Sequence, residues 1–181
     1  MSDLLAASPG LFFGSVLFNK ENLSYIEIKK IWEERFGTSV EFHHHFFPMK
    51  DYYSKQMGEV SKLSRILFVG LNPAKRELLI AHKVWADQLE KKITLDKSSR
   101  ALNLDIGLLT LENVTLATGK NLSHRIYLGE GVYSDLNLKF ENKSFRALPW
   151  AYPDYAHPDF IHFFNWVRGF LHRKIVKKIL D

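Results

Sequence analysis

The sequence predicts an α+β fold, mainly an antiparallel sheet covered by helices. Short apolar runs typical of buried strands alternate with amphipathic segments at helical spacing, and a glycine-bearing turn joins two later strands as a hairpin. The order strand, helix, strand, strand, helix, strand is that of the ferredoxin-like βαββαβ fold, followed here by an added hairpin and a C-terminal helix. Because no repeat or Gly/Ser-rich linker divides the 181 residues, we expect a single domain over residues 1–181.

The first part of the chain supplies the predicted alternation of strands and helices. Strands are predicted over residues 11–18, 40–47 and 66–71, and helices over residues 25–36 and 73–93. The spacing of Ser24 and Glu27 is that of a capping box, which marks the start of the first helix. Asn72 is a favourable N-cap and Pro73 a favourable first helical residue, so together they mark the start of the second helix.

The second part of the chain predicts a loop, a strand, a hairpin and a final helix. Residues 94–109 lack strong periodicity, so we expect an ordered loop there. Strands are predicted over residues 114–118, 125–128 and 132–140, and the turn Gly129-Glu130-Gly131 joins the last two. The expected cross-strand pairs on one face are Leu128 with Val132, Tyr127 with Tyr133 and Arg125 with Asp135.

The composition excludes several classes of site. The absence of cysteine rules out thiolate zinc sites, iron–sulfur clusters, disulfides and thiol nucleophiles. With 25 Lys and Arg against 20 Asp and Glu, the formal charge is +5, and the densest basic segment is Arg168 to Lys178 in the predicted final helix. Neither a signal peptide nor a membrane span is predicted, so we expect a cytoplasmic protein.

The segment from Thr118 to Asn121 resembles the end of a phosphate-binding loop without completing it. Val114 stands where that loop requires a glycine, and Asn121 replaces the Ser or Thr that would hold magnesium. The G-x-G-x-x-G, G-x-S-x-G and H-E-x-x-H patterns are also missing. The sequence therefore does not predict a P-loop GTPase or ATPase, a Rossmann dinucleotide site, an α/β-hydrolase or a zincin protease.

Polar side chains gather on the predicted loop and on one hairpin face, where an amphipathic sheet does not require such a mixture. The candidate ligand-binding residues are Asn103, Asp105, Lys120, His124, Arg125, Tyr127, Tyr133 and Asp135. The cations of this set suit a phosphate or carboxylate group, while its carboxylates suit the orientation of a ligand. We therefore expect an anionic, phosphate- or nucleotide-like small molecule to bind here, without assigning a reaction. The alternative is a plain cross-strand ion pair between Arg125 and Asp135.

Two further segments support different functions. His43 and His45 lie on one side of the predicted strand, about 7 Å apart at their Cα atoms, a spacing that metal sites use, for example in a metal-dependent hydrolase. No third ligand is fixed by spacing, so we assign no metal ligands and name no cofactor. The basic final helix and the aromatic segment from Trp150 to Tyr155 favour the alternative of a noncatalytic module that binds RNA or a protein. The same aromatic segment is also typical of a packed corner.

Several motifs together resemble the prokaryotic domain-of-unknown-function 4416 family. They are Arg100-x-x-Asn103-Leu104-Asp105-x-Gly107, Leu116-Ala117-Thr118-x-Lys120, His124-Arg125-Ile126-Tyr127-Leu128 and Trp150-x-Tyr152-Pro153-Asp154-Tyr155. Ile106 stands where the family usually has proline, and Ala156 where it has arginine. The resemblance implies a stand-alone cytoplasmic domain with no established activity. Members are sometimes labelled GTP-binding proteins, a label that the incomplete phosphate loop does not support.

Overall fold

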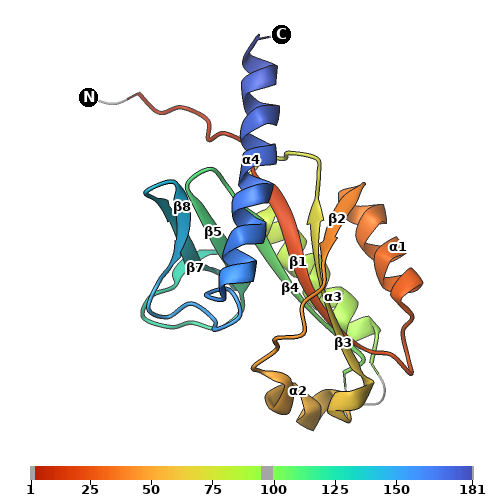
Figure 1. Cartoon of the computed structure of the whole chain (residues 1–181). Coiled ribbons are helices and arrows are strands. Elements are labelled where there is room, and N and C mark those ends of the chain that lie inside the picture. Colours follow the sequence, from red (N-terminus) through yellow and green to blue (C-terminus); the bar gives the residue numbers. More distant parts are fainter. Residues whose placement is uncertain (1–2, 95–99, 181) are drawn as a thin grey trace.

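The computed structural model describes residues 3–94 and 100–180. Within these residues, an 8-stranded antiparallel sheet has the strand order β2-β3-β1-β4-β5-β7-β6, and β8 pairs with β7. The helices cover both faces of this sheet (Figure 1). The α+β class predicted from the sequence is therefore confirmed.

The strands are β1 (Leu11–Asn19), β2 (Ser39–Phe42), β3 (Leu63–Gly70), β4 (Leu102–Leu109), β5 (Asn113–Thr118), β6 (Ile126–Gly129), β7 (Val132–Glu141) and β8 (Ser144–Ala147). The helices are α1 (Tyr25–Phe36), α2 (Lys50–Met57), α3 (Leu78–Lys92) and α4 (Pro158–Leu180), with one 3-10 turn, η1 (Val60–Lys62).

The first four strands form the ferredoxin-like part of the sheet. Their order β2-β3-β1-β4, with every neighbouring pair antiparallel, is the one that the βαββαβ sequence pattern predicts. The fourth strand, however, is β4 rather than the segment 114–118, which forms β5 and extends the sheet. The loop predicted over residues 94–109 is therefore wrong from Leu102 onward, and residues 95–99 lie outside the described part of the chain. Both faces of β4 are covered, so its buried apolar residues lack the one-sided pattern expected of a strand.

Two other boundaries differ from the predictions, and two elements were not predicted. The second helix begins at Leu78 instead of Pro73, because Ala74 forms an isolated bridge with Gly10. The strand predicted over residues 40–47 ends at Phe42. The helix α2 and the strand β8 were not predicted, since their segments are short and largely polar.

The hairpin and the first helix cap are confirmed. Tyr127 pairs with Tyr133 as predicted, although a register shift places Gly129, not Leu128, opposite Val132. The Ser24 side chain accepts the Glu27 N–H, and the Glu27 side chain accepts the Ser24 N–H.

Two hydrophobic cores hold the layers together. On one face, α1 and α3 pack on the sheet through residues such as Trp32 and Leu79. On the other face, α4 packs through residues such as Phe164 and Val167. Each core buries large side chains against the same central strands, so the position of β1 and β4 is fixed from both sides.

The contact between β1 and β4 depends on a glycine. Phe13 on β1 lies opposite Gly107 on β4, and the Phe13 ring occupies the space where a Gly107 side chain would stand. A Cβ at this position would lie 2.1 Å from the ring. The ring in turn packs against Phe164 of α4, with 5.3 Å between ring centroids, so it has little room to move.

We predict that Gly107→Ala lowers the free energy of unfolding by about 1–3 kcal/mol, because overpacking displaces the Phe13 ring. Gly119→Ala is the matched control, since nothing lies within 4 Å of a Cβ added there. Urea denaturation monitored by circular dichroism measures both variants. A Gly107→Ala protein as stable as the wild type would contradict this packing.

Candidate functional site

The candidate site is a cleft that opens where β4 and β5 separate. The two strands pair only over residues 107–109 of β4 and 114–116 of β5. Beyond this short contact, β4 remains paired with β1, and Asp105 lies opposite Ser15. The strand β5 remains paired with β7 instead. Because neighbouring strands in a sheet twist relative to one another, each strand turns with its own partner and the sheet divides.

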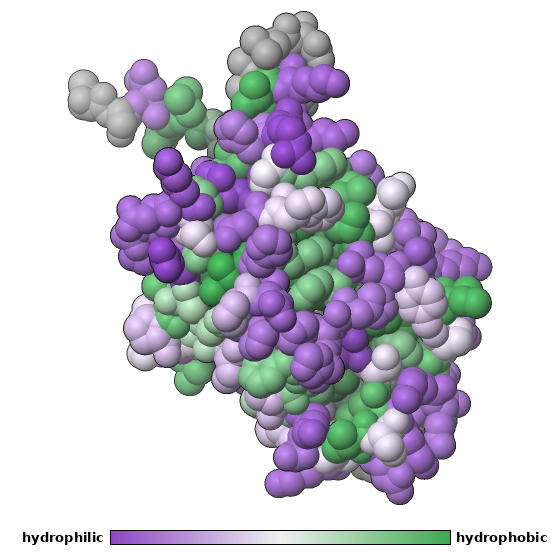
Figure 2. All heavy atoms as spheres, in the orientation of Figure 1, coloured by the Kyte–Doolittle hydropathy of each residue, from purple (hydrophilic) through white to green (hydrophobic). Residues whose placement is uncertain are grey.

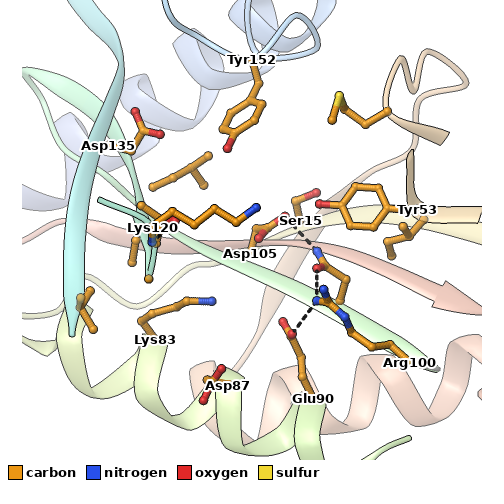
Figure 3. A pocket seen from close by; sticks show the side chains of 18 of the residues that line it. Ser15, Tyr53, Lys83, Asp87, Glu90, Arg100, Asp105, Lys120, Asp135 and Tyr152 are labelled. Atoms are coloured by element: carbon orange, nitrogen blue, oxygen red, sulfur yellow. Dashed lines mark hydrogen bonds and ion pairs between the residues drawn. The ribbon is translucent and has the colours of Figure 1, made fainter. Parts of the chain in front are cut away.

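The cleft has a volume of about 560 Å³ and is lined by side chains from both sides of the divided sheet. In Figure 3, Lys83 and Glu90 of α3 form one wall, Asp105 of β4 lies near the centre, and Tyr53 and Tyr152 approach from the other side. A volume of about 300–1,000 Å³ is typical of clefts that take small molecules. The cleft is therefore large enough for a metabolite-sized ligand.

Most charged side chains around the cleft already have partners. The ion pairs are Arg65 with Asp154, Lys91 with Asp87 at 2.6 Å, Arg100 with Glu90 at 3.5 Å and Arg125 with Asp135 at 2.7 Å. Lys83, Lys120 and Asp105 also line the cleft, and among the described residues none of the three forms an ion pair. In Figure 3 the two lysine side chains extend toward the interior from different walls.

A short chain of hydrogen bonds holds Asp105 in place. Arg100 Nη1 donates to Asn103 Oδ1 over 3.3 Å, and Asn103 Nδ2 donates to Asp105 Oδ2 over 3.0 Å. Arg100 Nη2 also donates to Gln56 Oε1 of α2 over 2.8 Å. The carboxylate of Asp105 is thus oriented by one neutral donor, the Asn103 amide, and keeps acceptor capacity for a ligand.

Glu90 closes the exposed edge of β4. The N–H of Leu104 has no β5 partner because the strands have separated, and it donates to Glu90 Oε1 over 2.7 Å. The pKa of Glu90 is raised to about 7: burial is the largest cause and the nearby Asp105 carboxylate adds to it, while the Leu104 N–H, Lys83 and Arg100 act in the opposite direction. The wall of the cleft therefore contains a carboxyl group that titrates near neutral pH.

Arg125 lies behind the cleft wall and connects several of its residues. Its guanidinium donates to Asp135 Oδ2 over 2.9 Å, to the Lys120 carbonyl over 2.9 Å and to the Tyr152 hydroxyl over 3.4 Å. The guanidinium is buried and its charge is neutralised by Asp135. Arg125 thus forms the predicted cross-strand ion pair and positions Lys120 and Tyr152, without lining the cleft itself.

The structure divides the sequence-predicted site residues into two groups. Asn103, Asp105, Lys120 and Asp135 line the cleft. His124, Arg125, Tyr127 and Tyr133 do not. His124 stacks on Trp150, with 5.0 Å between ring centroids, and Tyr127 packs against Tyr133 on the outer hairpin face.

Sequence reasoning missed cleft residues that come from distant segments. They are Ser15 of β1, Tyr53 of α2, Arg65 of β3, Lys83 and Glu90 of α3, and Tyr152 of the turn before α4. A single polar residue inside an apolar strand was an available signal for Ser15, whereas Arg65 lies beside Ser64 at the polar start of its strand. Arg65 Nε donates to Ser15 Oγ over 2.9 Å, and its guanidinium pairs with Asp154. Burial raises the pKa of Tyr53 and Tyr152, so both hydroxyls stay neutral donors.

The triple histidine does not assemble the metal site considered from the sequence. His43 contacts Glu41 at 3.1 Å, while His45 stacks on His44. Among the described residues, the group with ligand atoms within 4.8 Å of one another is His44, His157 and Asp159.

The hydrogen bonds of this second group do not suit a metal ion. His44 Nδ1 accepts the Phe46 N–H, which leaves the ring proton on Nε2, and Nε2 contacts Asp159 Oδ2 at 2.9 Å. His157 Nδ1 likewise accepts the Asp159 N–H. Metal-binding histidines usually donate from the second ring nitrogen instead of accepting there. The group therefore fits a set of hydrogen bonds at the start of α4 better than a metal centre.

The aromatic segment before α4 forms a corner, with one exposed ring. Tyr155 and Asp154 are buried, and Asp154 Oδ1 accepts the Tyr155 N–H over 3.0 Å. Trp150 is 43% exposed and donates to the Leu136 carbonyl.

Of the helices within the described residues, none has the length and apolar composition that crossing a membrane requires.

We predict that Glu90 makes stability fall as pH rises. Because its folded-state pKa of about 7 exceeds the ordinary glutamate value of 4.5, the folded chain binds more protons between these two pH values, and the stabilising contribution of Glu90 is lost as pH rises through 7. The slope from this group is at most about 1.4 kcal/mol per pH unit. Urea denaturation at pH 5 and pH 7.5 should show a smaller difference for Glu90→Gln than for the wild type. The exposed Glu34→Gln control should keep the wild-type difference, and an identical difference in Glu90→Gln would contradict the shift.

Comparison with known proteins places the chain through a family model and not through an individual protein. A search of curated proteins and a search of solved structures found no match. The model of the family described as Domain of unknown function (DUF4416) matches residues 8–170, which include all four strands of the ferredoxin-like part and the whole cleft. The resemblance noted in the sequence is thereby confirmed, and the chain belongs to the DUF4416 family.

Proposed function

We propose that the protein binds an anionic, phosphate- or nucleotide-like small molecule in the cleft between β4 and β5. The observation that supports this proposal is the approach of Lys83 and Lys120 into one cleft without an ion-pair partner among the described residues. Two ammonium groups near each other repel, and an anion between them removes that repulsion. Lysine binds phosphate as a point charge, so the two side chains need no fixed planar geometry.

The pairing of the surrounding charges favours the same conclusion. The other basic groups around the cleft are engaged by Asp154, Asp87, Glu90 and Asp135. Lys83 and Lys120 form no ion pair with the described residues, and Lys120 Nζ lies 6.0 Å from the centre of the Tyr52 ring. Arg125 anchors the backbone of Lys120 through its carbonyl, which limits the movement of that wall. Lys83 is half-buried in the cleft wall, so its side chain loses less entropy on binding than a free surface lysine, whereas Lys120 is exposed.

The alternative is a noncatalytic module that binds RNA or a protein through the C-terminal helix. Arg173, Lys174 and Lys177 are exposed on the part of α4 that projects beyond the sheet (Figures 1 and 2). Arg168 belongs to the same helix but is used internally, because it donates to the Leu111 carbonyl and lies over the Phe140 ring. An exposed basic helix end also suits the negative pole of the helix dipole, so the observation favours plain helix stabilisation more strongly than it favours RNA or protein binding.

We predict that Lys83→Gln and Lys120→Gln each weaken the binding of inorganic pyrophosphate by about tenfold or more, because each removes a charge-assisted contact. Isothermal titration calorimetry measures the affinity at fixed ionic strength. Lys174→Gln combined with Lys177→Gln is the control with exposed lysines and should leave the affinity within about twofold.

The same variants test the alternative. Binding of a single-stranded RNA oligonucleotide that weakens steeply with salt, and that is lost in the Lys174 and Lys177 variant, would support the interaction module. No heat and no change in melting temperature with inorganic phosphate, pyrophosphate, AMP or ribose 5-phosphate would overturn the small-molecule proposal.

A further inference from the structure

We propose that the ligand is a phosphate ester of a polyhydroxyl compound, with its phosphate near Lys83 and Lys120 and its hydroxyl groups donating to Asp105 and Asp135. This inference rests on the proposed function and specifies the part of the ligand that the lysines do not contact. It follows from two carboxylates that line the cleft, Asp105 and Asp135, and keep acceptor capacity beyond their observed hydrogen bonds.

Asp135 provides the first acceptor. It is 2% exposed, and both of its short contacts with Arg125 use Oδ2. Oδ1 is buried and accepts no hydrogen bond from the described residues, and His124 Nε2 lies 3.5 Å away. A buried carboxylate oxygen without a donor is uncommon in folded proteins and calls for an explanation. Because Asp135 lines the cleft, a donor on a bound molecule provides one.

Asp105 provides the second acceptor from the other half of the divided sheet. Its observed hydrogen bond comes from Asn103 and uses Oδ2. Asp105 belongs to β4 and Asp135 to β7, with β5 between them in the sheet. In Figure 3 the two carboxylates lie on different sides of the Lys120 side chain. A ligand that satisfies both must therefore carry donors at more than one position.

Hydroxyl groups fit these acceptors better than a metal ion or a single ammonium group. In the described part of the chain, neither Asp105 nor Asp135 belongs to a group of three or more possible ligands whose atoms lie within 4.8 Å of one another, so they do not form a three-ligand site for a divalent cation. An ammonium group has its donors on one atom and reaches one of the two carboxylates. A chain or ring of hydroxyls presents donors at several positions, and carboxylates accept from neighbouring hydroxyls readily.

The neutral walls of the cleft agree with such a ligand. The hydroxyls of Tyr53 and Tyr152 remain protonated because burial raises their pKa values, so they can donate to ester or ring oxygens. A sugar phosphate and a nucleoside monophosphate share the polyhydroxyl phosphate ester that these residues recognise. The nucleoside monophosphate differs from the sugar phosphate by its base, so a comparison of the affinities for ribose 5-phosphate and AMP distinguishes the two kinds of ligand.

The test compares affinities for ribose 5-phosphate, AMP, phosphoserine and inorganic phosphate by isothermal titration calorimetry on the full chain. For the wild type, we expect ribose 5-phosphate or AMP to bind at least about tenfold more tightly than inorganic phosphate. In Asp105→Asn, this ratio should fall below about threefold, because a neutral amide is a weaker acceptor. Asp105→Ser provides a second variant, and melting temperatures establish that each variant folds.

Asp87→Asn is the matched control, because Asp87 lines the cleft but is paired with Lys91. It should keep the wild-type ratio. Equal binding of ribose 5-phosphate, AMP and inorganic phosphate, or tighter binding of phosphoserine, would overturn the polyhydroxyl inference while leaving the anion-binding proposal intact. A preference that survives in both Asp105 variants would also overturn it. If no phosphate compound binds, the anion-binding proposal fails and this inference fails with it.

Discussion

The separation of β4 from β5 is the constraint on which the candidate site depends. The two strands share a contact of three residues on each side, and beyond it each is held by a different neighbour. The Phe13 ring over Gly107 fixes β4 against β1 at the point of separation. A fully paired sheet would place β5 backbone where the cleft now lies. The polar residues of the cleft are therefore a consequence of where the pairing stops.

A divided sheet leaves backbone groups that must find other partners, and the structure solves this with charged side chains. Glu90 accepts the Leu104 N–H on the β4 side. On the β5 side, the Lys120 carbonyl accepts from Arg125, just after the strand ends. An unpaired buried backbone group costs about 1–3 kcal/mol, so the contact of Glu90 with the part-buried Leu104 N–H is part of the stability of the fold as well as of the cleft. The contact at the Lys120 carbonyl is exposed and mainly holds the cleft wall. Glu90 consequently cannot be removed without affecting both the fold and the cleft.

Much of the fold could be predicted because it depends on local signals. Short segments of sequence determine the capping box of Ser24 and Glu27 and the pairing of Tyr127 with Tyr133. They also determine the βαββα order of elements. The strand β4 was missed although Leu102, Asn103, Leu104 and Asp105 alternate strictly between apolar and polar residues. That alternation continues into the apolar run Ile106 to Leu109, where coverage of both faces hides it. Buried central strands are the elements for which sequence periodicity is least informative.

The candidate site could be predicted only in part, because its residues meet through the topology and not through their spacing. Asn103, Asp105, Lys120 and Asp135 were predicted together from their polarity on neighbouring segments, and the structure places all four around one cleft. Lys83 was not, since nothing in the sequence of α3 shows that it lies beneath the gap between two later strands. Arg125 illustrates the opposite error: its chemistry suits an anion, but a buried arginine that already has a carboxylate and two further acceptors contributes by holding other residues in position. The number of partners that a charged side chain already has thus separates ligand-binding groups from supporting ones more reliably than its residue type.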